Sequence, residues 1–129
     1  MRIRKKAIVA AAFEPLFKVR FWFIYGPEQV LLDRAKSLLG ESVEPHGGAG
    51  RTVSARVNGS VVILVFVSDT LPISDPAVVG VLAHEAVHAA GAVFEGVGVR
   101  SLLGRTDGTD EFMAYYVEWI VRTALKELR

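Results

Sequence analysis

The segment from Pro76 to Phe94 is the feature that most constrains how this chain folds. Its residues are apolar except for His84, Glu85 and His88, and Asp75 stands directly before Pro76 as a helix N-cap. The apolar residues predict a helix that packs in the core. Two imidazoles and a carboxylate are costly to bury on such a helix unless something pairs with them. The sequence therefore predicts a partner for this turn of the helix, and a metal ion would be one.

His84 and His88 are spaced so that one metal ion can bind both. Residues i and i+4 project from the same face of an α-helix, so the two rings can bring nitrogens to about 2.0–2.1 Å from a single Zn²⁺. Glu85 lies beside them, where a carboxylate can take a proton from a water activated by the metal. The alternative is that backbone carbonyls and Glu85 satisfy both histidines. We expect a zinc site because three polar groups on one turn of an apolar helix need more partners than the backbone offers.

The rest of the sequence predicts one α+β domain over residues 1–129, built on a small twisted sheet. Asn58-Gly59 between two β-branched runs favours a type I′ turn and a hairpin over about 53–68, whose second strand is apolar on both faces and therefore central. The other predicted elements are a strand over 18–25, a helix over 27–40, a loop over 41–51, the motif helix over about 76–91, and a C-terminal helix over about 110–128 capped by Thr109.

Composition excludes several function classes. Fifteen basic and fourteen acidic residues give a net charge of +1, which offers no general field for nucleic acid or an anionic membrane. The run Ala7–Phe13 is at the short limit of a secretory signal and stops at Glu14-Pro15, and the run Val61–Val67 is far below the roughly 20 residues of a membrane span. With no cysteine, the chain suits a reducing compartment. We therefore expect a soluble, cytoplasmic protein without a nucleic-acid or membrane partner.

The order of a twisted sheet, an HExxH helix and a second long helix resembles the zincin metallopeptidases. Metzincins extend the motif to HExxHxxGxxH, and this chain matches as far as Gly91 but has Phe94 where the third ligand should stand. Gluzincins take a glutamate from a later helix, and the segment 110–116, which contains Glu111, is similar to that element. The chain is also similar to small bacterial and phage-encoded metallopeptidases. The resemblance covers roughly residues 61–121.

The resemblance implies a zinc metallopeptidase that cleaves a peptide or protein substrate. It places Zn²⁺ on His84, His88 and Glu111, with Glu85 as the general base. A substrate would lie along the edge strand 53–57. Apart from the resemblance, a functional interpretation of the polar stripe on the last helix has Tyr115 within reach of the substrate oxyanion and Glu118 in support of a ligand histidine. The expected site residues are therefore His84, Glu85, His88, Glu111, Tyr115 and Glu118.

Other interpretations of these residues stay open. The stripe formed by Glu111, Tyr115, Glu118 and Arg122 also fits a plain solvent-facing side of a helix, on which Glu118 and Arg122 form an exposed ion pair. The third ligand has weaker candidates in His46, which lies in a glycine-rich loop, and in Glu95 and Asp107.

A different class of function is also open. The chain can be a non-catalytic zincin-like module that binds a partner protein, since an HExxH motif is necessary but not sufficient for hydrolysis. A domain this small has few residues for a cleft wall, so a partner chain or self-association is expected to complete it. The aromatic residues predicted to be exposed for that contact are Phe21, Phe23 and Trp119.

Overall fold

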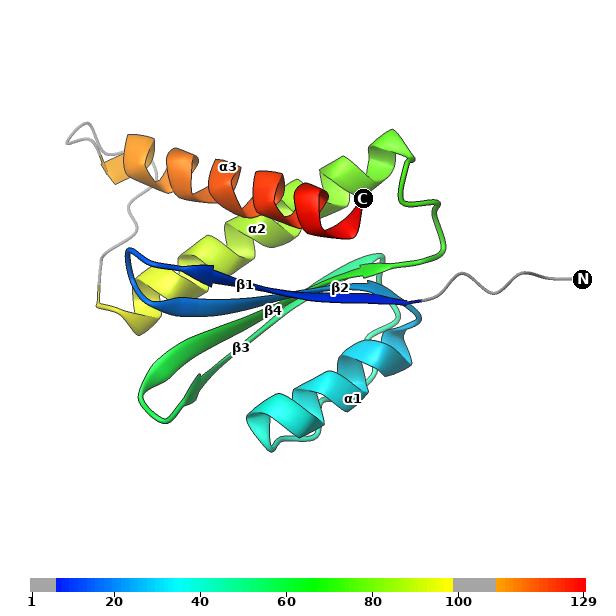
Figure 1. Cartoon of the computed structure of the whole chain (residues 1–129), viewed down its shortest axis with the longest axis horizontal. Coiled ribbons are helices and arrows are strands. Elements are labelled where there is room, and N and C mark those ends of the chain that lie inside the picture. Colours follow the sequence, from blue (N-terminus) through cyan, green and yellow to red (C-terminus); the bar gives the residue numbers. More distant parts are fainter. Residues whose placement is uncertain (1–6, 99–108) are drawn as a thin grey trace, which may run out of the picture.

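A computed structural model describes residues 7–98 and 109–129 and has a four-stranded mixed sheet with helices on both faces (Figure 1). The sheet order is β1-β2-β4-β3, in which β2 and β4 pair in parallel and the two outer pairs are antiparallel. One helix, α1, covers one face, whereas α2 and α3 cover the other. The fold is therefore of the expected α+β class. The elements are β1 (Ile8–Glu14), β2 (Val19–Gly26), α1 (Glu28–Leu39), β3 (Gly50–Val57), β4 (Ser60–Ser68), α2 (Pro76–Gly96) and α3 (Thr109–Leu128).

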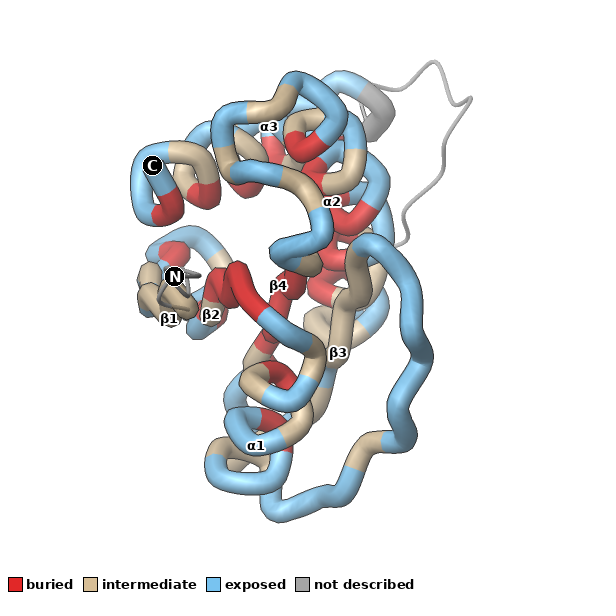
Figure 2. The backbone as a smooth tube through the Cα atoms, turned by 90° about the vertical axis from the view of Figure 1, so that its right-hand side faces the viewer, coloured by how far each residue is buried: buried red, intermediate tan, exposed pale blue. Residues whose placement is uncertain are grey.

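The two central strands supply the core on both faces of the sheet. Along β2, Phe21 and Phe23 pack toward α2 and α3, whereas Ile24 packs toward α1. Strand β4 alternates in the same way, with Val65 on the first face and Leu64 on the second. Figure 2 shows the buried residues concentrated on these strands and on the inner sides of the helices. This two-sided burial is why the sequence of β4 is apolar at nearly every position.

Local signals in the sequence predicted several elements well. The hairpin turn has positive φ at Asn58 (51°) and Gly59 (82°), as a type I′ turn requires. Asp75 caps α2, because its side chain accepts the N–H of Ala77 at 2.8 Å. Helix α2 is also the one described helix that is long and apolar enough to cross a membrane, and 44% of that window is buried inside the fold.

Three features of the fold were not predicted from the sequence. Strand β3 begins at Gly50, inside the loop predicted over 41–51. The alanine-rich run that ends at Phe13 forms the edge strand β1, paired with β2 along its whole length. Helix α2 continues past Gly91 to Gly96, because Val93 and Phe94 are fully buried and their packing offsets the cost of a helical glycine.

The expectation that Phe21 and Phe23 are exposed for self-association is wrong. Both side chains are completely buried under α2 and α3, where Phe21 contacts Tyr116 and Trp119. Trp119 itself is only partly buried. The sequence alone does not show which of these aromatic residues are buried, because this depends on which faces of the sheet the helices cover.

Helix α3 is attached to the sheet by a buried carboxylate. Glu14, at the end of β1, is 4% exposed and accepts the N–H groups of Leu16 at 2.6 Å and Phe17 at 3.0 Å. The hydroxyl of Tyr116 on α3 donates to the same carboxylate at 3.1 Å. Burial, and then the charge of Glu14, raise the pKa of Tyr116 above its ordinary value. The contact joins two segments that lie at opposite ends of the chain.

We expect Tyr116→Phe to lower the free energy of unfolding by about 1.5–3 kcal/mol, because it removes a hydrogen bond to a charged group. Urea denaturation measures this change. Tyr115→Phe is the matched control, since its side chain is 63% exposed, and it should leave stability unchanged. The raised pKa of Tyr116 means that its contribution is complete below pH about 10, where unfolded tyrosine begins to ionise, and is lost above it. Equal stability of the two variants would contradict this account of how α3 is held.

Candidate functional site

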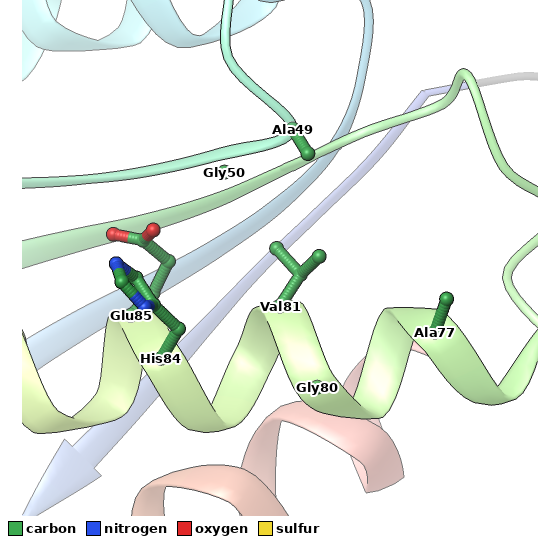
Figure 3. Close-up of a pocket in the computed structure, with 7 residues that line it drawn as sticks. All are labelled: Ala49, Gly50, Ala77, Gly80, Val81, His84 and Glu85. Atoms are coloured by element: carbon green, nitrogen blue, oxygen red, sulfur yellow. The ribbon is translucent and has the colours of Figure 1, made fainter.

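The rotation of α2 about its axis decides which side chains of the motif face the protein and which face water. Val78, Leu82, Ala86 and Ala89 are buried against the sheet and α3. The motif residues lie on the side of α2 nearest to the edge strand β3. Figure 3 shows His84 and Glu85 beside one another, next to the strand that begins at Gly50.

The two histidines are held close together at the surface. The Nε2 atoms of His84 and His88 are 3.2 Å apart, and both side chains are exposed to solvent. This differs from the expectation that the motif imidazoles are buried. Water can solvate them, so they need no buried partner, and the cost of burial applies only to Glu85.

Glu85 is the buried member of the motif and is 7% exposed. Its Oε1 accepts a hydrogen bond from the Thr52 hydroxyl on β3 at 2.9 Å, and the same hydroxyl lies 3.1 Å from the backbone carbonyl oxygen of Glu85. A hydroxyl has one proton, so the two acceptors share it. The other carboxylate oxygen, Oε2, has no hydrogen-bond partner among the described residues. One oxygen of Glu85 is therefore fixed and the other is free to accept a proton.

Gly50 allows β3 to approach the motif helix this closely. A Cβ atom at this position would lie 2.5 Å from Val81 Cγ1 and 3.0 Å from Glu85 Cγ. Both distances are at or below the limit of real contacts, so a side chain here has to displace Val81 or the carboxylate. Gly50 is thus a steric requirement for the position of Glu85.

A groove follows the contact between α2 and β3. One hollow of about 460 Å³ is lined by small residues, including Ala77 and Gly80, and reaches His84 and Glu85. A second hollow of about 480 Å³ shares His84 and Glu85 with the first and adds His88. The first hollow is mainly apolar, and the second is mainly polar. An extended chain laid along the groove would pass directly over the motif.

The glutamates expected on α3 do not join the histidines in this structure. Glu111 is exposed, and no group of three His, Asp or Glu side chains suited to a metal forms among the described residues. Glu118 is also exposed and forms an ion pair with Arg122, as the solvent-facing interpretation of this stripe expects. The assignment of Glu111 as the third ligand stays a prediction.

The remaining candidates are dispersed. Tyr115 lies at a separate hollow with Glu118 and Trp119, not in the groove beside the motif. Glu95 is exposed and lines a further hollow together with Ala92 and Gly96. Asp107 lies outside the described residues. The role of Tyr115 at an oxyanion therefore also stays a prediction.

Thr52 and Gly50 belong to the site but were missed by sequence reasoning. The period-2 pattern of β3 places both on one face of the strand, and that signal was available. Which residue of α2 lies opposite them depends on how the helix crosses the sheet, and no local pattern specifies this. Comparisons with protein-family models, characterised proteins and solved structures found no match to this chain.

We expect Gly50→Ala to destabilise the protein by about 1–3 kcal/mol, because the added methyl group overpacks the contact with Val81 and Glu85. Urea denaturation measures the loss. Gly48→Ala is the matched control, since a Cβ there meets only the Gly50 carbonyl oxygen at an ordinary 3.5 Å. If both variants are equally stable, the close approach of β3 to α2 is not as tight as described.

Proposed function

We propose that this protein is a zinc-dependent hydrolase, of the kind of a small zincin-like metallopeptidase that cleaves peptide bonds. The observation that carries the proposal is the 3.2 Å separation of the His84 and His88 Nε2 atoms. Two ligands of a tetrahedral zinc ion with Zn–N bonds of 2.0–2.1 Å are about 3.3 Å apart. The pair thus has the spacing of two zinc ligands. A hydrogen bond between the two rings would give the same distance between their Nε2 atoms.

Two coordination positions of one zinc ion can be filled by the histidine pair. His84 and His88 would hold the ion, and Glu111 is the proposed third ligand, as the resemblance to gluzincins implies. When bound, Zn²⁺ supplies Lewis-acid chemistry, which polarises a carbonyl and makes water easier to deprotonate. A catalytic zinc site keeps one position open for this purpose.

Glu85 is proposed to act as the general base and then as the general acid. Thr52 holds one carboxylate oxygen, which leaves Oε2 available at the groove. This oxygen takes a proton from the attacking water and returns it to the leaving amine. A residue in this role needs a fixed rotamer and a free lone pair, and the contacts of Glu85 support both.

The substrate is proposed to bind as an added strand. Strand β3 pairs only with β4 among the described strands, so its other edge has backbone groups available to an extended peptide. Helix α2 lies beside this strand, and the groove follows the same direction. A peptide bond in the groove would lie next to Glu85 and the histidines.

The rival function is a non-catalytic module that binds a partner protein. One observation favours it: among the described residues, no third carboxylate or imidazole completes the histidine pair. In such a module the groove along β3 would bind a partner's strand without cleaving it.

We expect Glu85→Gln to keep zinc bound while lowering turnover by about 10²–10⁴-fold, because glutamine retains the shape but cannot take a proton. Zinc content and hydrolysis of a mixed peptide library, measured on the same preparation, check this. Loss of zinc in the variant would instead identify Glu85 as a ligand. Zinc bound by the parent protein without any hydrolysis would favour the binding module.

The third ligand is tested by zinc titration of single variants on α3. We expect Glu111→Ala to weaken zinc binding by at least about 10–100-fold. Removing a residue that only hydrogen-bonds to a metal ligand already lowers metal affinity by this factor. Glu127→Ala is the control, because Glu127 is exposed on the same helix. A loss confined to Glu118→Ala would move the ligand to Glu118 and contradict the assignment of Glu111.

A further inference from the structure

The loop over residues 41–49, between α1 and β3, is anchored beside the groove. The Oε2 atom of Glu28, in the first turn of α1, accepts the backbone N–H groups of His46 at 2.9 Å and Gly47 at 3.0 Å. These two donors are the main reason that the pKa of Glu28 is lowered. Although this loop is rich in glycine, Glu28 fixes its tip.

His46 reaches the hollow that contains the motif. It lines the same space of about 480 Å³ as His84, Glu85 and His88, although it lies on a different element. It does not join the two histidines in a group of three ligands, so its ring stands apart from their Nε2 atoms. His46 therefore lines the space in which a substrate would lie.

Some hydrogen-bond donors of this hollow already have acceptors. The single proton of the Thr52 hydroxyl is shared between two acceptors on Glu85, and one of the five N–H groups of the Arg51 guanidinium donates to the carbonyl oxygen of Glu44 at 2.5 Å. The ring of His46 has no hydrogen-bond partner among the described residues. Tyr115, which the sequence suggested as the oxyanion donor, lies at a separate hollow. His46 is therefore better placed than Tyr115 to donate a hydrogen bond to a substrate.

Resting on the proposed function, we propose that His46 is a catalytic residue that donates a hydrogen bond to the scissile carbonyl oxygen, and that Glu28 is a positioning residue for it. As water adds to the carbonyl carbon, Glu85 receives the water proton and negative charge develops on the carbonyl oxygen. The ring N–H of His46 stabilises this charge without giving up its proton. The C–N bond then breaks, and the amine leaves with the proton from Glu85.

The test compares His46→Ala, His46→Gln and Glu28→Gln with the parent protein. Glu41→Gln is the matched control, because it removes a carboxylate from the same exposed loop. Each protein is titrated with Zn²⁺ alone. Each is then assayed for peptide hydrolysis and for binding of a phosphinic analogue of tetraalanine, whose tetrahedral anion resembles the charged transition state.

We expect His46→Ala to lower kcat by about 10²–10³-fold with little change in KM, as loss of one oxyanion donor does. Binding of the phosphinic peptide should weaken by a similar factor, whereas zinc affinity should stay that of the parent. His46→Gln keeps an N–H donor and should recover part of both losses. Glu28→Gln should lower kcat less than His46→Ala, and Glu41→Gln should match the parent.

Three results would overturn the proposal. Loss of zinc affinity in His46→Ala would make His46 a metal ligand instead. Unchanged kcat and unchanged phosphinic-peptide binding in His46→Ala, with an active parent, would remove His46 from the mechanism but leave the hydrolase standing. A zinc-loaded parent that neither cleaves peptides nor binds the phosphinic peptide would overturn both proposals.

Discussion

The close approach of helix α2 to the edge strand β3 is the constraint on which the rest of the site depends. Gly50 lets the strand begin against Val81 and Glu85, and the Thr52 hydroxyl then fixes the carboxylate from the strand side. With Glu85 held inward, the i, i+4 geometry of the helix sends the two motif imidazoles to the open side of the contact. One packing contact thus separates a buried carboxylate from two exposed imidazoles.

This separation changes the physical argument for a metal. On the sequence alone, zinc was expected because burying three polar groups on one helical turn is costly. In the structure, His84 and His88 are exposed and need no such compensation, and Glu85 is satisfied in part by Thr52. The proposal of a zinc site therefore rests on the spacing of the two Nε2 atoms and on the chemistry of the motif, not on the cost of burial.

Sequence patterns predicted the parts of the fold that depend on neighbouring residues. Asn58-Gly59 defined the hairpin, Asp75 the start of α2, and the apolar run of β4 its central place in the sheet. Strand β1 was missed because its alanines have weak β-propensity and the strand depends on pairing with β2. The sequence did not place Thr52 at the site and offered His46 only as a weaker candidate ligand, because each comes near the motif only through the packing of distant segments.

The most direct test of the central claim is X-ray absorption at the zinc edge on protein loaded with one equivalent of Zn²⁺. The account predicts a four-coordinate ion with two imidazole nitrogens at about 2.0–2.1 Å and oxygen donors at the other positions, together with the outer-ring scattering that is typical of histidine. The double variant His84→Ala, His88→Ala should lose this spectrum. A bound zinc ion with only oxygen ligands, or a spectrum unchanged in the double variant, would contradict the account.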